Sequence, residues 1–165
     1  MTPDPLDPRT LRQTLGRFVT GVTVIALESE GEVRAMTANS FTSLSLDPPL
    51  VLFCLGKDTK AGRHIRSVSG FAVSILGHHQ QDLSSYFAGS WKDEQPPPFT
   101  FETWDGGPRL EGCIAALGCR VHAIHEGGDH WIVVGEVIAT YRGDESGNPL
   151  VFFGGKYTSL GIEQS

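Results

Sequence analysis

The feature that most constrains this chain is a series of short apolar runs, rich in β-branched residues and separated by glycine, proline or polar turns. Examples are VTVIAL (22–27), LVLFCL (50–55) and FAVSIL (71–76). Runs of this length and composition predict β-strands that are largely buried, and LVLFCL is expected to be buried on both faces. The 20 glycines and 10 prolines exceed the usual combined share of about 12% and are scattered, which favours many short elements joined by turns.

Turn residues suggest how these strands connect. The polar ESEGE segment around Gly31 predicts a hairpin between 22–27 and a strand that begins near Val33. Further along, CIAALGCRVHAIHE and HWIVVGEVIATYR are expected to form a second hairpin through the Gly127–Asp129 turn, and GNPL precedes a last strand in VFFGGKY. Six or seven strands of this kind predict a mainly β fold, an antiparallel barrel with Greek-key-like crossings.

A few short helices are expected between the strands. Pro8 suits a first helical turn, and Leu11, Leu15 and Phe18 recur at helical spacing in a helix that Gly21 would end. Two further helices are predicted at 59–67 and 80–87. The GSWKDEQPPPF segment, with three consecutive prolines, is incompatible with a regular helix or a central strand and is expected to be a surface excursion.

Composition excludes several classes of protein. A length of 165 residues with 39% hydrophobic residues predicts one domain, and a net charge of −6 without a basic cluster argues against nucleic-acid binding. No segment resembles a signal peptide or a membrane helix, so a cytoplasmic protein without membrane contacts is expected. The three cysteines form no C-x-x-C pair and are expected to be free, buried thiols.

Two polar stretches could bind a ligand. In GKDTKAGRH, Thr59 can cap a helix beside Lys57, Lys60 and Arg63, an arrangement that suits a phosphate but equally suits a simple N-cap with solvated lysines. In MTANSFTSLSLDPPL, the side chains of Thr37, Asn39 and Ser40 could contact the heteroatom edge of a planar ring. A Ser/Thr-rich strand leading into a turn would have the same composition, and we assign Thr42, Ser43 and Ser45 to that structural role.

Other catalytic signatures are missing or weak. His130 follows the GGD turn at the start of a strand, where it could donate a hydrogen bond to a polar ligand or simply be a surface residue. The histidines have no metal-binding spacing, so no metal is predicted. The chain lacks G-x-S-x-G, G-x-G-x-x-G and P-loop motifs, so any nucleotide must be bound by another device.

The order of several segments resembles the flavin reductase family, whose members are the reductase components of two-component flavin-dependent monooxygenases. The segments are, in order, GVTVIAL, MTANSFTSLSLDPPLVLFCL, FAVSIL with QQDLSSYFA, GGPRLEGCIAALGCRV, GGDHWIVVGEV and PLVFFGGKY. The resemblance spans about Asp7 to Leu160. It implies a split β-barrel that binds FMN or FAD and forms a homodimer with the flavin sites near the subunit interface. It also implies an enzyme that reduces flavin with NADH or NADPH, whereupon the reduced flavin diffuses to a separate monooxygenase.

The resemblance also implies which residues form the site. The flavin ring and ribityl chain would lie against Arg34, Ala35, Met36, Thr37, Asn39 and Ser40. The ribityl and phosphate end would contact Cys54, Leu55, Gly56, Thr59, Lys60 and Ala61, and a further flavin contact is expected from Tyr86 and Phe87. The nicotinamide nucleotide would be bound by His130, Phe153, Gly154, Gly155 and Tyr157.

In such a reductase hydride passes directly from nicotinamide to flavin, so no catalytic acid or base is expected and the protein contributes by stacking and positioning the rings. The phosphate loop departs from many relatives in having Gly62 and extra cations, which leaves the choice between FMN and FAD open. Two alternatives stay open beside the reductase. One is a non-catalytic flavin-binding protein for electron transfer, and the other is an enzyme like pyridoxine-phosphate oxidase.

Overall fold

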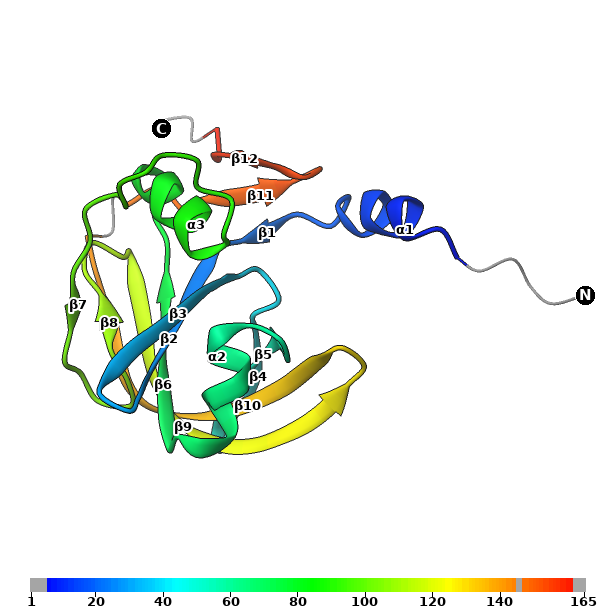
Figure 1. Ribbon diagram of the computed structural model, residues 1–165. Helices are drawn as coiled ribbons and strands as arrows, with labels where there is room; N and C mark the ends of the chain where they lie inside the picture. The colour runs from blue at the N-terminus through cyan, green and yellow to red at the C-terminus, as the bar shows by residue number, and fades with distance from the viewer. Residues whose placement is uncertain (1–5, 145–146, 162–165) are drawn as a thin grey trace, which may run out of the picture.

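The computed structural model describes residues 6–144 and 147–161. Within these residues, a strongly curved sheet of seven antiparallel strands forms the body of the molecule (Figure 1). In sheet order the strands are β3 (Glu32–Ala38), β2 (Thr23–Ser29), β6 (Gly70–Ile75), β9 (Ala115–Gly127), β10 (His130–Arg142), β5 (Pro49–Gly56) and β4 (Thr42–Leu46). The prediction of a mainly β, antiparallel fold is therefore confirmed.

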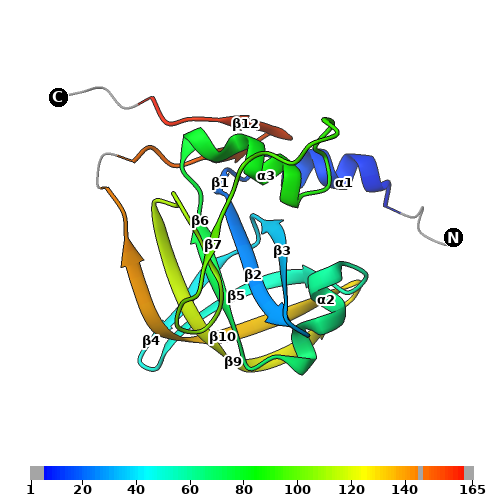
Figure 2. The same cartoon turned by 60° about the vertical axis from the view of Figure 1, so that its left-hand side comes forward.

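Shorter elements surround this sheet. A three-stranded sheet contains β1 (Thr20–Gly21), β11 (Val151–Phe153) and β12 (Lys156–Thr158), and a small hairpin joins β7 (Phe101–Glu102) to β8 (Arg109–Leu110). The helices are α1 (Pro8–Leu15), α2 (Lys60–His64) and α3 (Gln81–Phe87), with 3₁₀ turns at Ile65–Ser67 and His78–Gln80. Helices α2 and α3 both contact β3, and Figure 2 shows α3 toward the top of the view and α2 lower down.

Tight glycine turns set the register of two hairpins. Between β2 and β3, Glu30 and Gly31 adopt φ of 57° and 74°, and between β11 and β12, Gly154 and Gly155 adopt φ of 61° and 77°. Two successive residues of positive φ match the twist of the flanking strands, which is why such turns favour glycine. The ESEGE hairpin is thus confirmed, whereas VFFGGKY is not one strand, because Gly154 and Gly155 form a turn between β11 and β12.

The core lies inside the curve of the sheet. Its main cluster includes Phe53 and Phe71, whose rings meet edge to face at 5.0 Å, and a smaller cluster lies beneath α3 around Leu76 and Leu110. Register shifts between β9 and β10 at Val134/Gly135 and Val137/Ala139 bend these long strands. Bulges of this kind increase local twist, so they help the sheet to wrap around its core.

The first helix is shorter than predicted. It begins at Pro8, where the Asp7 carboxylate accepts hydrogen bonds from the amides of Arg9 and Thr10, but it ends at Leu15 and not near Gly21. Gly16 ends it because glycine is a poor helix former and because no residue of α1 is buried against the rest of the chain. Figure 1 shows the helix projecting away from the body.

Strand β5 is also less buried than predicted. Val51, Phe53 and Leu55 face the core, whereas the alternating residues Leu52 and Cys54 are only half-buried, so the strand is not buried on both faces. Of the three free cysteines, Cys113 and Cys119 are buried as expected, while Cys54 is partly accessible. The remaining predictions at 59–67, 71–76 and 80–87 are confirmed by α2 with its 3₁₀ turn, by β6 and by α3.

No helix within the described ranges is long and apolar enough to cross a membrane. In the same part of the chain, no group of three or more His, Cys, Asp or Glu side chains is placed to hold a metal ion.

Candidate functional site

A pocket of about 580 Å³ lies along β3 between α2 and α3, and we call it the β3 pocket. It brings together most of the residues that the sequence assigned to a flavin: Arg34, Ala35, Met36, Thr59, Lys60, Ala61, Tyr86 and Phe87. These residues come from three segments that are distant in sequence, so their convergence depends on the fold. A volume of this size falls within the range of about 300–1,000 Å³ typical of ligand sites.

The loop between β5 and α2 forms one wall of this pocket. The Thr59 hydroxyl donates to the Gly56 carbonyl at 2.8 Å and accepts from the Gly62 amide at 2.9 Å, so it caps α2 and ties the helix to the end of β5. A β-carbon at Gly62 would lie 2.0 Å from the Gly56 oxygen, so only glycine allows this close approach. Ala61 is fully buried in the same place, which leaves mainly its backbone to contact a ligand.

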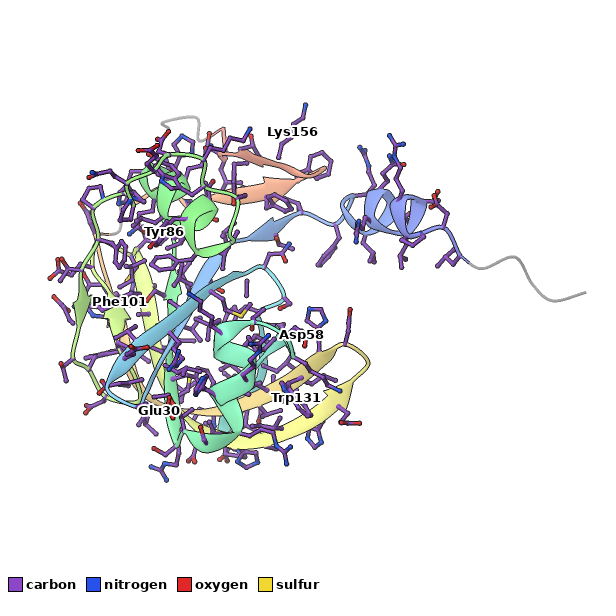
Figure 3. The ribbon with its side chains drawn as sticks, viewed as in Figure 1. Glu30, Asp58, Tyr86, Phe101, Trp131 and Lys156 are labelled. Atoms are coloured by element: carbon purple, nitrogen blue, oxygen red, sulfur yellow. The ribbon has the colours of Figure 1, made fainter. Side chains whose placement is uncertain are left out.

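The cations predicted to form an anion site are not all directed toward the β3 pocket. Lys57 pairs with Glu126 at 3.4 Å and lies 4.5 Å from the Trp131 ring, and Figure 3 places Trp131 at the β9–β10 hairpin, away from Tyr86. Arg34 lines the pocket but its charge is offset by Glu30 at 3.3 Å and Glu32 at 3.4 Å. Lys60 is exposed at the pocket and forms no ion pair among the described residues.

A polar chain connects β3, α3 and β12 next to the β3 pocket. Thr37 donates its hydroxyl to the Ser84 carbonyl at 2.6 Å, and the Ser84 hydroxyl lies 2.8 Å from the Tyr157 hydroxyl. Thr37, Asn39 and Tyr157 line a small cavity of about 140 Å³ at this junction. Ser84 therefore links Thr37, which was predicted to contact flavin, to Tyr157, which was predicted to contact the nicotinamide nucleotide.

Sequence reasoning missed Ser84. It is fully buried in α3, but the QDLSSYF segment contains two adjacent serines and gives no signal that distinguishes them.

Of the polar residues after Thr37, one bonds within the fold and one keeps its side chain available to a ligand. The Ser40 hydroxyl donates to the Cys54 carbonyl and accepts from the Cys54 amide, both at 3.0 Å, so it already bridges two strands. The Asn39 side chain is exposed and forms no hydrogen bond within the described structure, so its amide can still meet a ligand. Leu55 is fully buried, and its side chain belongs to the core.

His130 lies at the rim of the sheet, paired in register with Gly56 at the end of β5. Its Nδ1 lies 2.7 Å from the Asp129 carboxylate. Its Nε2 lies beside Gly56, 3.8 Å from the point that a β-carbon on that glycine would occupy. The hydrogen bond from His130 is the largest cause that lowers the pKa of Asp129 below its ordinary value, and the charge of Lys57 acts in the same direction. An ionised carboxylate only accepts hydrogen bonds, so Nδ1 carries the proton and Nε2 is left for a ligand.

The residues predicted for the nicotinamide nucleotide do not form one cluster in a single chain. Phe153, Gly154, Gly155 and Tyr157 belong to the β11–β12 hairpin, whereas His130 belongs to the β9–β10 hairpin. Figures 1 and 2 both place these hairpins on different sides of the molecule.

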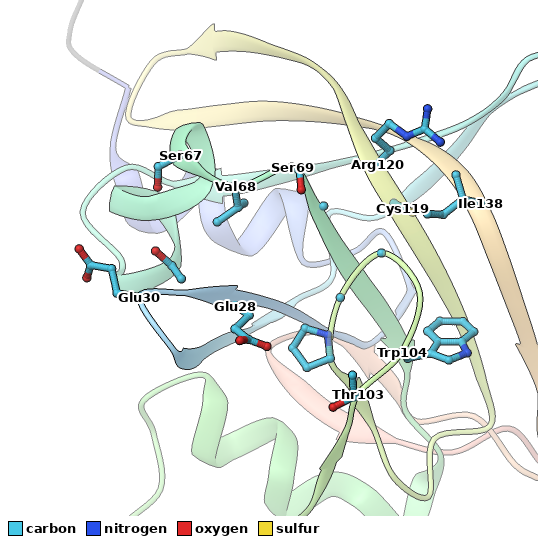
Figure 4. Close-up of a pocket in the computed structure, with 15 residues that line it drawn as sticks. Glu28, Glu30, Ser67, Val68, Ser69, Thr103, Trp104, Cys119, Arg120 and Ile138 are labelled. Atoms are coloured by element: carbon cyan, nitrogen blue, oxygen red, sulfur yellow. The ribbon is translucent and has the colours of Figure 1, made fainter.

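A second concavity of about 790 Å³ lies elsewhere, between the loop 103–108 and strands β6 and β9 (Figure 4). Its labelled side chains include Glu28, Trp104 and Arg120. None of the residues predicted to contact flavin or nicotinamide lines it. The β3 pocket, although smaller, is therefore the one that the chemistry supports.

The antiparallel β fold, with a pocket of nucleotide size between two short helices, places this protein among small nucleotide-binding β proteins. The model of the flavin reductase like domain matches residues 15–161. The chain belongs to this family.

Similar proteins agree with that assignment. The NADH-dependent FAD reductase of Streptomyces globisporus is 42% identical over 163 residues, covering 93% of this chain and 86% of the relative. The reductase subunit HsaB of a flavin-dependent monooxygenase from Mycobacterium tuberculosis is 36% identical over 165 residues, covering 97% and 86%. The structure of the Streptomyces globisporus NADH:FAD oxidoreductase SgcE6 with NAD and FAD fragments superposes with a TM-score of 0.86 at 38% identity, covering 98% of each chain.

Proposed function

We propose that this protein is an NAD(P)H:flavin oxidoreductase that reduces FMN or FAD and supplies the reduced flavin to a separate monooxygenase. The observation that carries the proposal is the β3 pocket, where eight residues predicted to contact flavin line one cavity. The relatives support it, because one is named for FAD reduction with NADH and another as the reductase subunit of a monooxygenase.

The pocket suits a flavin in chemistry as well as in size. Met36 and Ala35 offer an apolar surface to a ring, and Lys60 offers a positive charge to a phosphate. Asn39, which lines the cavity of about 140 Å³ at the Thr37–Tyr157 junction, offers an amide. We assign the remaining predicted flavin residues to the same site: Arg34, Thr37, Ser40, Cys54, Leu55, Gly56, Thr59, Ala61, Tyr86 and Phe87. Of these, Ser40, Leu55 and Ala61 act through backbone or packing, since their side chains are already occupied or buried.

When bound, flavin and nicotinamide supply the hydride acceptor and donor, so the protein's own work is positioning. The Thr37–Ser84–Tyr157 chain fixes the junction between β3 and the β11–β12 hairpin. Asp129 fixes the ring of His130, which then presents Nε2 to a carboxamide. Phe153, Gly154, Gly155 and Tyr157 complete the proposed nicotinamide site.

We further infer that the curved sheet is the split β-barrel of this family and that two copies form a homodimer. The dimer is supported by large apolar side chains that the single chain leaves exposed on α1, on the segment after it and on β4: Leu11, Leu15, Phe18, Val19, Leu44 and Leu46. Exposed apolar patches of this extent mark interaction surfaces. A second copy would also offer a way for His130 and Tyr157 of different chains to serve one nicotinamide.

The test is NADH or NADPH oxidation, followed at 340 nm, with FMN or FAD added to the purified protein. Turnover that depends on added flavin, and that reduces cytochrome c through the released flavin, is the expected result. No turnover with any of the four cofactor pairs would refute the reductase and leave a flavin-binding protein. Oxidation of pyridoxine phosphate without NADH would instead favour the oxidase alternative.

A further inference from the structure

One wall of the β3 pocket is aromatic, and the proposed contacts to a flavin ring and phosphate leave part of it unexplained. Tyr86 and Phe87 at the end of α3 pack against Phe99 and Phe101, with ring centroids 5.0 to 5.8 Å apart. Phe99 is still 39% exposed, although it lines the pocket. An aromatic ring that is held in a cluster but keeps one face open is suited to stack on another planar ring.

Phe99 is the last residue of the segment 89–99, which was predicted to be a surface excursion and was assigned no ligand contact. The excursion is confirmed, since 89–99 contains no helix or strand, but hydrogen bonds tie the chain down at both ends. At the start, Ser90 donates its amide at 3.0 Å and its hydroxyl at 3.1 Å to the Ser85 carbonyl, and directly after the segment the Thr100 carbonyl accepts from the Glu111 amide at 3.0 Å. Inside the segment, Trp91 donates its ring N–H to the Gln95 carbonyl at 2.9 Å.

Three prolines restrict φ directly before Phe99, and the middle one, Pro97, is buried. The segment therefore presents Phe99 to the pocket in a restricted conformation, which reduces the entropy lost on binding.

The charged groups of the pocket come from other elements than this wall, Lys60 from α2 and Arg34 from β3. Lys60 is unpaired among the described residues, while Arg34 shares its charge with Glu30 and Glu32. A cation without an ion pair and an aromatic wall in the same pocket are a combination that suits a nucleotide, whose phosphate meets the cation while its base stacks on the ring.

Resting on the proposed function, we propose that Phe99, supported by Tyr86, binds the adenine ring of FAD, so that the protein binds FAD more tightly than FMN. FMN ends at its phosphate and has no second ring to stack on Phe99 once its own ring lies on Ala35 and Met36, whereas FAD continues through a second phosphate to adenine. The adenine of NADH is a weaker candidate because neither His130 nor Tyr157 lines the β3 pocket.

The test is Phe99→Ala, with Phe99→Trp as the matched control that keeps a stacking surface. Flavin fluorescence titration gives the Kd for FAD and for FMN in each variant. Loss of one base–aromatic stack predicts that Phe99→Ala raises the Kd for FAD about tenfold while the Kd for FMN changes less than about twofold. Phe99→Trp is expected to keep the wild-type Kd for both flavins. AMP, used as a probe without any flavin ring, is expected to compete with FAD and not with FMN.

Several results would overturn the proposal: equal weakening of FAD and FMN in Phe99→Ala, no change for either flavin, a wild-type preference for FMN, or AMP competing with neither flavin. Failure of the proposed function has a different signature. The wild-type protein would then bind flavins with the expected selectivity but oxidise no NADH or NADPH. Conversely, retained FMN reduction by Phe99→Ala together with weakened FAD binding supports both proposals.

Discussion

At the scale of single residues, the Asp129 carboxylate decides how His130 can act. It holds the proton on Nδ1, so a neutral His130 offers Nε2 as a hydrogen-bond acceptor and becomes a donor there only when the ring is protonated. The sequence suggested a donor, but a carboxamide carries both an NH₂ group and a carbonyl. Neutral His130 can therefore accept from the NH₂ group without any change in protonation.

His130→Ala is expected to raise the KM for NADH about three- to tenfold, as the loss of one hydrogen bond predicts, while the Kd for flavin stays within about twofold. Asp129→Asn keeps the size of the partner and is expected to have a smaller effect in the same direction. Steady-state kinetics and flavin titration measure the two quantities. If His130→Ala instead weakens flavin binding and leaves the KM for NADH unchanged, His130 belongs to the flavin site.

The three cysteines differ in accessibility and therefore in expected reactivity. Burial raises the pKa of Cys119 from 9.0 to about 12 and also raises that of Cys113, so both stay as unreactive thiols in the folded protein at pH 8. The unfolded chain ionises these thiols near pH 9, so their burial begins to disfavour folding as the pH rises above that value.

A thiol reagent such as dithionitrobenzoate is expected to modify one cysteine per folded chain at pH 8, namely Cys54, and all three in denaturant. If Cys54 borders the bound flavin as proposed, added FMN will slow its modification. Mass spectrometry of the labelled peptides identifies the site. Rapid labelling of Cys119 without denaturant would contradict the burial on which this expectation rests.

At the scale of elements, the close packing of α2 on the end of β5 shapes the wall of the β3 pocket. Gly62→Ala would place a β-carbon 2.0 Å from the Gly56 carbonyl oxygen, which forces the backbone apart. Overpacking of this kind costs about 1–3 kcal/mol, which corresponds to a fall in Tm of roughly 2–12 °C for a chain of this size. Flavin affinity is expected to fall as well, because Thr59 and Lys60 move with the helix.

The matched control is Gly21→Ala, since a β-carbon there would meet nothing within 4 Å. Thermal unfolding and flavin titration of both variants separate the contact from the general effect of replacing glycine. A Gly62→Ala protein as stable as Gly21→Ala would mean that α2 can shift without cost.

The strands were predictable from sequence because each has a local cause, such as the β-branched run at 22–27 or the turn at Gly31. The helix after Pro8 was predicted too long because its apolar spacing suggested packing that the single chain does not provide. Much of the candidate site was identified through family resemblance. A resemblance indicates which positions line a site, but it does not show which side chains contact one another there.

Site details that depend on contacts between distant segments were not predictable from the sequence. Ser84 joins Thr37 to Tyr157, and Phe99 reaches the pocket from a segment whose prolines predicted only a surface loop. Such roles arise from contacts between segments that are distant in sequence, where no periodic pattern relates the residues: Thr37 and Ser84 are 47 residues apart, and Ser84 and Tyr157 are 73. The Ser40 hydroxyl shows the converse, because composition made it a ligand candidate and the fold uses it to join two strands.

At the scale of the whole molecule, α1 and the segment that follows it are the strongest support for a dimer. Leu15 and Phe18 are 64% and 79% exposed, so they gain little from folding of the single chain. A groove of about 730 Å³ runs between this segment and residues 39–42, next to the proposed flavin site. A second copy seated there would cover the apolar side chains and border Asn39.

Phe18→Glu is therefore expected to convert the protein from a dimer to a monomer, because a carboxylate buried in an apolar interface without a partner is costly. Light scattering should give twice the chain mass of 17.9 kDa for the wild type and the single mass for the variant. Gln13→Glu is the control, since it adds the same charge to an exposed position of α1 and should leave the dimer intact. The circular dichroism and Tm of Phe18→Glu distinguish dissociation from unfolding.

A wild-type protein that is monomeric at micromolar concentration, or a Phe18→Glu protein that is still dimeric, would show that α1 does not form the interface. If residues from two chains complete the nicotinamide site, NADH oxidation should fall together with dimerisation, while flavin binding in the β3 pocket of each chain persists.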